Sequence, residues 1–349
     1  MTSKAHELMA EINKVLGSGT VRLGSDTSLE VEYIPTGIFP IDHLLGGGIP
    51  KGRFTELFGA YSTLKSYIGL STIAQAQKLG GVCAIIDTEH AYDPEWAQGL
   101  GVDTDTLIYQ SPQTGEEAMD VAEVLIRNGV DLIVWDSIAA TVPQAESIKR
   151  MHKESVQPAR LAALMSTGLR KLTAANKHTA VLFINQTRVN VGVMFGDPEV
   201  VAGGKALPYY ASYRVALRKA GKIKDTEDGF DDEGHKAKIN KVTGIKIKAT
   251  LEKSKLSAPS TEALFTFDLT TGQIDEVGYL IAGGLNKGII KHEGRSWWVS
   301  EEEKTVGLDK FRGWLQQNEE VKEQIRKTLL PSHGKLEAGK SKVGSRKKK

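Results

Sequence analysis

The sequence predicts an α/β protein whose sheet is mixed and mainly parallel. From Thr36 to about Thr270, apolar strand-like runs alternate with segments whose apolar residues recur at helical spacing, which is typical of α/β folds. A glycine-led loop, residues 59–66, stands between an apolar run and a helix-like segment, residues 67–79. A further apolar run ends in the carboxylate of Asp136. These observations together predict a nucleotide-binding core with parallel central strands and antiparallel strands added late in the chain.

The expected strands of this core share a short apolar run bounded by polar or turn residues. Besides the run at residues 54–58, they are Val82–Asp87, Leu107–Gln110, Leu132–Asp136, Ala180–Asn185, Tyr213–Leu217, Lys246–Leu251 and Leu264–Leu269.

The chain begins with an expected amphipathic helix and strand, residues 1–35. The apolar residues that share one helical face are Leu8, Met9, Ile12, Val15 and Leu16. Gly17 offers a C-cap for this helix. The segment Leu29–Tyr33 alternates strictly between apolar and polar residues, which predicts a half-buried strand. The apolar faces of both elements need to be buried, either against the core or against another subunit.

The loop Gly59-Ala60-Tyr61-Ser62-Thr63-Leu64-Lys65-Ser66 matches the phosphate-binding pattern G-x-x-x-x-G-K-[ST] except at one position. In that pattern, backbone N–H groups surround the phosphates, the lysine reaches their outer oxygens and the hydroxyl ligates Mg²⁺. Leu64 occupies the second glycine position. A surface turn rich in serine and threonine is the plain alternative, but the strand before the loop and the helix after it favour nucleotide binding.

Two carboxylates at strand ends fit the same chemistry. Asp136 is placed as P-loop ATPases place the aspartate of the Mg²⁺ shell, although a carboxylate that caps a helix is the alternative. Glu89 follows the strand that ends at Asp87, and we expect it to be the general base that activates water. Its neighbour His90 fits a hydrogen-bonded structural role better than a catalytic one. After the strand that ends at Asn185, the amide of Gln186 could sense a γ-phosphate by hydrogen bonding.

Two polar segments are candidates for contact with nucleic acid. Residues 187–204 combine Arg188, several glycines and the apolar pair Met194-Phe195, a combination that fits single-stranded nucleic acid. Residues 146–158 carry Lys149 and Arg150, which could contact phosphates. A long loop inside a compact domain is usually functional or disordered.

The last third of the chain divides into three expected parts. Residues 221–240 are polar and predict a projecting hairpin or mobile loop. Residues 271–330 predict a small α+β C-terminal domain with an aromatic strand around Trp297-Trp298-Val299. Residues 331–349 form a basic tail, in which Lys335–Lys349 hold seven Lys or Arg against one Glu. Such a tail could contact phosphate backbones or have no role.

Composition limits the class of protein. The chain has 349 residues, 40% of them hydrophobic, and a net charge of +2, so overall charge says little about partners. Its single cysteine, Cys83, excludes an internal disulfide and fits a small core residue in a reducing cytoplasm. We expect no secretory signal and no membrane span, because no segment reaches the roughly 20 apolar residues that a span needs.

Long strings of the sequence resemble the RecA family of recombinases over nearly the whole chain. The strings are Thr36-Gly37 through Gly48-Ile49-Pro50-Lys51-Gly52-Arg53, Ile86-Asp87-Thr88-Glu89-His90-Ala91-Tyr92-Asp93-Pro94, Trp135-Asp136-Ser137, and Phe183-Ile184-Asn185-Gln186-Thr187-Arg188 into Gly192-Val193-Met194-Phe195-Gly196. The resemblance implies a RecA-type P-loop ATPase core that needs ATP and Mg²⁺. It also implies a DNA-dependent ATPase that forms helical filaments on single-stranded DNA and exchanges strands with a homologous duplex.

The resemblance also implies roles for individual residues. Residues 59–66 hold the phosphates, Ser66 and Asp136 support Mg²⁺, Glu89 and Gln186 serve catalysis, and Asp93 and Trp96 recognise adenine. Lys253 and Lys255 match lysines that reach the ATP of a neighbouring subunit, in addition to the catalytic Lys65. The DNA contacts implied are Arg188, Asn190, Val191, Gly192, Met194, Phe195, Lys149 and Arg150. The helix and strand of residues 1–35 match an element that packs on the adjacent protomer.

Three departures from the family pattern suggest a bacteriophage-encoded or divergent bacterial member. Leu64 replaces the loop glycine, a position that also departs from glycine in the phage UvsX-like branch. The segment 146–158, which matches the first DNA-binding loop of the family, is longer and more basic, and the tail is basic rather than acidic. Two alternatives stay open: a ring-forming helicase-like or clock-type ATPase on the same core, and a DNA-binding scaffold with little hydrolysis. The N-terminal helix and strand and the Met194-Phe195 loop argue against the first, whereas Leu64 makes the second conceivable.

Overall fold

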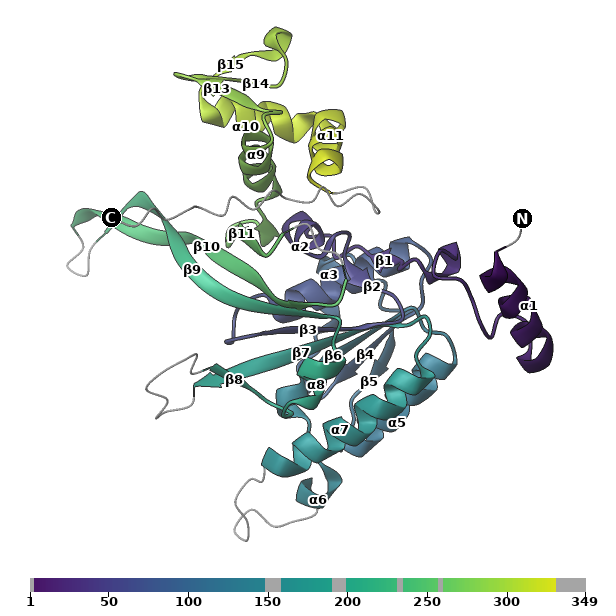
Figure 1. Cartoon of the computed structure of the whole chain (residues 1–349). Coiled ribbons are helices and arrows are strands. Elements are labelled where there is room, and N and C mark those ends of the chain that lie inside the picture. Colours follow the sequence, from purple (N-terminus) through teal and green to yellow (C-terminus); the bar gives the residue numbers. More distant parts are fainter. Residues whose placement is uncertain (1–2, 148–157, 190–198, 231–234, 257–259, 331–349) are drawn as a thin grey trace, which may run out of the picture. The chain divides into compact units, whose positions relative to one another are not determined.

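The computed structural model describes residues 3–147, 158–189, 199–230, 235–256 and 260–330 (Figure 1). The chain divides into two compact units, Met1–Tyr33 and Ile34–Lys349.

The first unit contains the expected amphipathic helix but not the expected strand. Helix α1 (Lys4–Leu16) ends at Gly17, whose φ of 105° suits glycine and whose N–H donates to the Asn13 carbonyl. None of its residues is buried, and on the predicted apolar face Met9 and Ile12 are half-buried whereas Leu8, Val15 and Leu16 are exposed in the part of the chain that the structure describes. The prediction of a strand at Leu29–Tyr33 was wrong: Leu29 ends a short 3₁₀ helix, η1 (Thr27–Leu29), and only Tyr33 enters β1 (Tyr33–Ile34). A strand needs a partner for its backbone groups, and the described part of this unit offers no other strand.

The second unit is built on a ten-stranded sheet in which six neighbouring strands run parallel. In spatial order the parallel set is β5 (Ile108–Gln110), β4 (Cys83–Asp87), β6 (Leu132–Asp136), β7 (Ala180–Val189), β3 (Phe54–Gly59) and β9 (Tyr213–Phe230). Three antiparallel strands follow, β10 (Lys236–Ser254), β11 (Glu262–Asp268) and β12 (Gln273–Ile274). This order confirms the predicted α/β class and the late antiparallel additions.

Helices cover both faces of the sheet (Figure 1). Helix α3 (Lys65–Lys78) lies on one face, and α5 (Gly115–Arg127), α7 (Pro158–Ala175) and α8 (Ala206–Tyr210) lie on the other. Buried side chains from these last three helices, including Met119, Leu169 and Leu207, pack with Trp135 and Phe183 of the sheet. The single cysteine, Cys83, is buried, and this burial raises its pKa to about 12, which confirms the predicted core role.

Shorter elements complete this unit. They are α2 (Phe39–Leu45), β2 (Ile49–Pro50), which pairs with β1, α4 (Pro94–Gly99), η2 (Ile138–Ala140), α6 (Gln144–Ser147) and β8 (Glu199–Val201).

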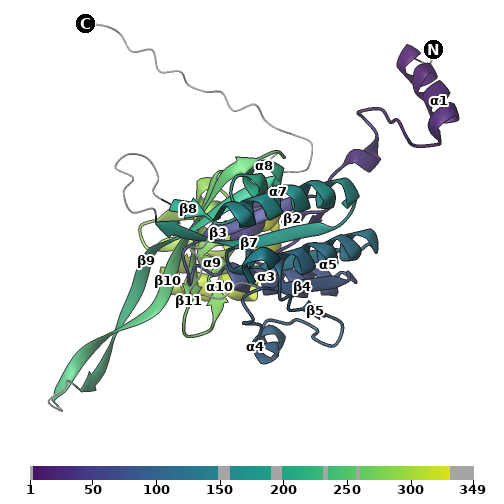
Figure 2. The ribbon, with the colours of Figure 1, turned by 90° about the horizontal axis from the view of Figure 1, so that it is seen from below.

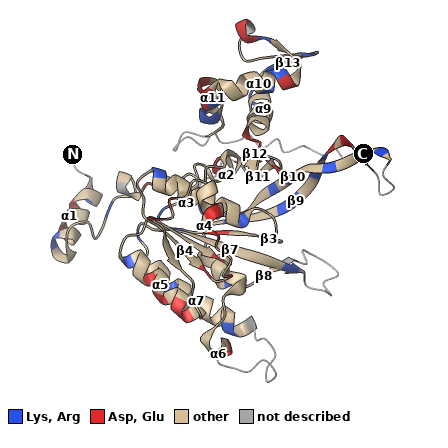
Figure 3. Ribbon diagram, turned by 180° about the vertical axis from the view of Figure 1, so that it is seen from behind, with Lys and Arg blue, Asp and Glu red and all other residues tan. Residues whose placement is uncertain are grey.

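Strands β9 and β10 continue beyond the sheet as a long two-stranded hairpin, as the polar segment 221–240 predicted. The pairing runs from Tyr213 opposite Ser254 to Phe230 opposite Lys236. Figure 2 shows the ribbon projecting from the body of the unit, and Figure 3 shows that it carries both basic and acidic residues.

The segment after β12 has its own apolar core. Helices α9 (Glu276–Asn286), α10 (Leu308–Gln317) and α11 (Glu319–Leu329) pack around Leu280, Phe311 and Ile325, and Phe39 of α2 joins this cluster. Three short strands, β13 (Lys291–Glu293), β14 (Ser296–Trp298) and β15 (Thr305–Val306), form a small sheet beside η4 (Glu301–Glu303). Strand β14 is the predicted aromatic strand. Among the helices that the structure describes, none has the length and apolar character to cross a membrane.

Candidate nucleotide-binding site

The phosphate loop connects β3 to α3, as the sequence predicted. Its lysine is almost fully buried, and the Lys65 ammonium donates hydrogen bonds to the carbonyls of Gly59 (3.0 Å) and Ala60 (2.7 Å). Burial lowers the pKa of Lys65, while the nearby charges of Asp136 and Glu89 raise it. A side chain at Gly59 would place its Cβ 2.1 Å from the Leu217 carbonyl oxygen, so only glycine fits between the loop and β9.

Leu64 stands at the position where the pattern has glycine, and its backbone conformation shows why glycine is usual there. It is the N-cap of α3 and has φ 69° and ψ 17°, the left-handed conformation. That conformation costs a residue with a side chain about 1–2 kcal/mol. The chain therefore retains the loop geometry of a glycine with a strained leucine.

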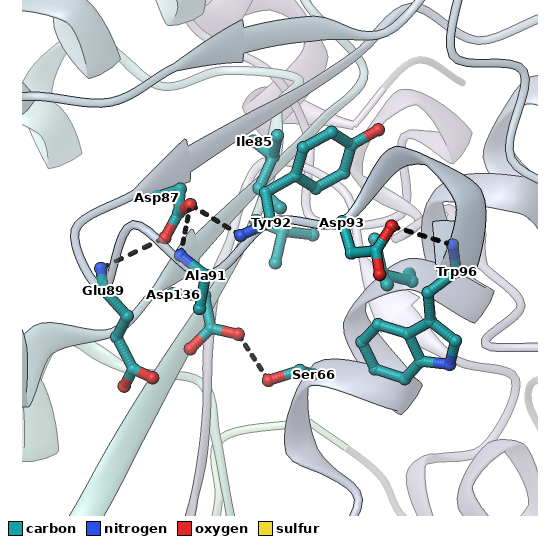
Figure 4. Close-up of a pocket in the computed structure, with 11 residues that line it drawn as sticks. Ser66, Ile85, Asp87, Glu89, Ala91, Tyr92, Asp93, Trp96 and Asp136 are labelled. Atoms are coloured by element: carbon teal, nitrogen blue, oxygen red, sulfur yellow. Dashed lines mark hydrogen bonds between the residues drawn. The ribbon is translucent and has the colours of Figure 1, made fainter. Parts of the chain in front are cut away.

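Ser66 and Asp136 meet at the start of α3. The Ser66 hydroxyl donates to Oδ2 of Asp136 at 2.6 Å (Figure 4). Burial raises the pKa of Asp136 to about 6, and the hydrogen bond from Ser66 opposes this rise. A hydroxyl and a carboxylate are oxygen donors that suit Mg²⁺, which usually takes one or two protein ligands and completes its shell with phosphates and water. Accordingly, no cluster of three His, Cys, Asp or Glu that could hold a metal alone occurs among the described residues.

Glu89 and Gln186 are in direct contact. Oε1 of Glu89 accepts hydrogen bonds from Nε2 of Gln186 (2.5 Å) and from the Ser137 hydroxyl (2.5 Å). We predicted that Gln186 follows the end of its strand, but it lies inside β7, which continues to Val189. The strand is longer than expected because β8 pairs with Thr187–Val189 and satisfies their backbone groups. His90 is hydrogen-bonded to Ser111, which agrees with the structural role that we expected for it.

Asp87 shapes the turn that carries Glu89. Its carboxylate accepts from the backbone N–H groups of Glu89 (3.1 Å), Ala91 (3.0 Å) and Tyr92 (3.0 Å), as Figure 4 shows. Sequence reasoning quoted Asp87 within a family string but gave it no role. Four hydrogen-bonding partners, including the Tyr109 hydroxyl at 3.3 Å, make it the organiser of this turn.

Asp93 and Trp96 lie on the next turn and helix. Asp93 is the N-cap of α4, and its Oδ1 accepts from the N–H groups of Glu95 (2.9 Å) and Trp96 (3.3 Å). Trp96 is 43% exposed.

Two adjoining pockets gather most of these side chains. The first, of about 210 Å³, lies between Asp87, Tyr92 and Asp93, and the second, of about 420 Å³, follows the phosphate loop to Gln186. The pockets share Ser66, Glu89, Trp96 and Asp136. Phe267 of β11 and Gly272 of the β11–β12 turn also line the second pocket. Sequence reasoning missed both, since neither residue belongs to a nucleotide-binding motif.

Lys253 and Lys255 lie apart from these pockets, near the end of β10. Both ammonium groups donate to the Tyr209 carbonyl of α8, at 2.9 and 2.8 Å. Because they share this acceptor, the two ammonium groups lie on the same side of the segment. Burial and the charge of Lys255 lower the pKa of Lys253.

The predicted DNA contacts are described only in part. Arg188 is exposed on β7, opposite Val200 of β8, so the predicted loop 187–204 begins and ends as paired strands. The other candidates fall outside the described residues: Asn190, Val191, Gly192, Met194, Phe195, Lys149 and Arg150.

Comparison with known proteins matches this chain to one family. Residues 4–272 match the model of the RecA N-terminal domain. The chain is 42% identical to the protein RecA of Saccharopolyspora erythraea over 338 residues, 95% of this chain and 93% of that protein. It is 42% identical to RecA of Nocardia farcinica (95% and 92%) and 40% identical to RecA of Salinispora tropica (93% and 90%).

Proposed function

We propose specific roles for the residues of this chain, which belongs to the RecA family. As a member of that family it is a recombinase and a DNA-dependent ATPase. The roles below concern how its own side chains would bind ATP, hydrolyse it and pass the effect to DNA and to neighbouring copies.

ATP would bind across the two pockets, with its phosphates along the loop of residues 59–66. Lys65 would release the two loop carbonyls and turn to the outer phosphate oxygens, since a buried ammonium is strongly attracted to an anion. Ser66 and Asp136 would hold Mg²⁺, which neutralises phosphate charge as it builds. Trp96 and Phe267, which both line the second pocket, offer apolar surface for the base.

The observation that carries the hydrolytic role is the hydrogen bond between Gln186 and Glu89. An amide that bonds to the general base occupies the oxygen that would accept a proton from water. A γ-phosphate in the pocket would compete for the amide of Gln186, and Oε1 of Glu89 would then keep only the hydrogen bond from Ser137 and could accept a proton from water. The base and the phosphate sensor would in this way act as one switch.

Lys253 and Lys255 would act on the ATP of a neighbouring copy. Their position outside both pockets and their bonds to α8 support a role at an interface, where cations can stabilise transition-state charge in trans. Self-assembly is supported by α1, none of whose residues is buried by the described part of the chain. The edge strand β5, with Ile108 and Tyr109 exposed, offers backbone groups for a strand from another copy.

DNA contact would come from the predicted segments 187–204 and 146–158, and from the basic tail. Such contacts would be made mainly to phosphates and stacked bases, without reading of sequence. This role fits a cytoplasmic protein of a cell or an infected host.

A lysine substitution tests the nucleotide site. Lys65→Ala should abolish ATP hydrolysis and ATP-dependent strand exchange, whereas Lys78→Ala, an exposed lysine at the end of the same helix, should change neither. Unchanged exchange by the Lys65 variant would refute the assignment of the loop. Electron microscopy with ATP and single-stranded DNA should show open filaments, and closed rings would favour the helicase-like alternative.

A further inference from the structure

A fully buried carboxylate lies on the strand that leads into the phosphate loop, and neither ATP binding nor hydrolysis as proposed above uses it. Glu56 is three residues before Gly59 on β3, and its side chain has no exposed surface. Burying a charge is costly unless it is paired and hydrogen-bonded. The partners of Glu56 therefore explain why the charge is there.

The first partner leads to the γ-phosphate sensor. Oε1 of Glu56 accepts from Nδ2 of Asn185 at 3.0 Å, and Oδ1 of Asn185 accepts the backbone N–H of Gln186 at 2.9 Å. Nδ2 of Asn185 also donates to the Ala202 carbonyl at 3.0 Å, so this amide connects the two ends of the segment that carries Arg188. Glu56 thus fixes the orientation of Asn185, since a carboxylate accepts only from the NH₂ side of the amide.

The second partner leads to the interface lysines. Oε2 of Glu56 accepts from Nε of Arg214 at 2.6 Å, and Arg214 stands opposite Lys253 in the β9–β10 register. The guanidinium also lies 4.5 Å from the centre of the Phe58 ring and 3.5 Å from Glu252. Arg214 is thereby held by groups on β3 and β10 at once.

These two chains of contacts both end at the Glu56 carboxylate. We propose that Glu56 is a positioning residue that couples Gln186, through Asn185, to Arg214 and the strand carrying Lys253. A movement of Gln186 toward a γ-phosphate would pull on Asn185, and the shared carboxylate would pass the displacement to Arg214. ATP binding in one copy would in this way adjust the lysines that face the next copy. This inference rests on the proposed roles of Gln186 and Lys253.

The test is Glu56→Gln in the full chain. The amide keeps the volume, but it cannot accept from both Asn185 and Arg214 as two carboxylate oxygens do. Loss of one hydrogen bond to a charged group corresponds to a change of about tenfold or more in an equilibrium constant. We expect the rate of ATP turnover stimulated by poly(dT) to fall at least about tenfold, while the Kd of a fluorescent ATP analogue changes by less than about twofold.

A matched control is Thr55→Val, a neighbouring buried residue of β3 whose hydroxyl has no hydrogen-bond partner among the residues that the structure describes. It should leave stimulation and nucleotide affinity as in the wild type. In a Gln186→Ala background, Glu56→Gln should cause no further loss, because the coupling already lacks its first member. If Glu56→Gln does not fold, Arg214→Lys tests the same coupling. This variant keeps the positive charge and leaves Glu56 in place, and it should also reduce the stimulation of ATP turnover by poly(dT).

Normal stimulation in Glu56→Gln or in Arg214→Lys would overturn the proposal, as would an additive loss in the Gln186→Ala background. A wild-type chain without any stimulation by poly(dT) would instead contradict the proposed function itself. The two failures are therefore distinguishable.

Discussion

Replacing Trp96 by alanine should weaken ATP binding by an amount that the structure sets. Trp96 is 43% exposed, and a large aromatic side chain can bury up to about 250 Å², so about 100 Å² remains for a base to cover. At about 25 cal/mol per Å², this area corresponds to about 2.5 kcal/mol, which agrees with about 1–3 kcal/mol for stacking of a base on an aromatic ring. The expected loss is therefore about 60-fold in Kd.

The assay is equilibrium titration with two ligands, Mg–ATP and Mg–tripolyphosphate. Trp96→Ala should weaken the first and leave the second unchanged, because tripolyphosphate lacks the base, and Trp96→Phe should retain part of the affinity for ATP. Equal losses for both ligands would mean that the substitution disturbed the phosphate loop. An unchanged affinity for ATP would refute the placement of the base beside Trp96.

Three further predictions concern other parts of the chain. Because Lys253 and Lys255 are proposed to act in trans, an inactive double alanine variant mixed with inactive Glu89→Gln should recover ATPase activity at mixed interfaces; no recovery in filaments shown to contain both variants would favour a role in cis. Removing residues 335–349 should weaken duplex DNA binding and flatten its salt dependence, since each neutralised phosphate releases about 0.9 counterion; identical slopes for the full and truncated chains would leave the tail without a role. Burial raises the pKa of Asp42 to about 7 from 3.8. Its contribution to the free energy of unfolding is therefore complete below pH 4 and is lost as pH rises through 7; it amounts to a few kcal/mol, on the order of 1.36 kcal/mol for each pH unit. Urea unfolding at pH 5 and pH 8 should show this loss in the wild type and not in Asp42→Asn.

The sheet was predictable because its strands have the short apolar runs of buried parallel strands. The same local reasoning failed at Leu29–Tyr33, since alternation of side chains does not supply a partner strand. It also failed at Gln186, where pairing with the distant β8 extends β7 beyond its apolar run. Both errors concern hydrogen bonds to residues far away in the chain, which a local pattern does not contain.

Most residues of the candidate nucleotide site could be named from motif and strand-end position, and many of them line the two pockets. The left-handed conformation of Leu64 follows from the glycine that the pattern expects there. Glu56 could not be found in this way: a single glutamate in an apolar run has no periodic signal, and its partners Asn185 and Arg214 are 129 and 158 residues away. The suggested phage origin stays a prediction.

The most direct test of the central claim is ATP turnover by the wild type and by Glu89→Gln, each with and without single-stranded DNA. The glutamine keeps the shape of the side chain and removes the base. We predict that DNA stimulates the wild type, and that Glu89→Gln binds ATP with wild-type affinity and assembles on DNA but does not hydrolyse ATP. Normal, DNA-stimulated hydrolysis by Glu89→Gln would contradict the proposed switch between Glu89 and Gln186.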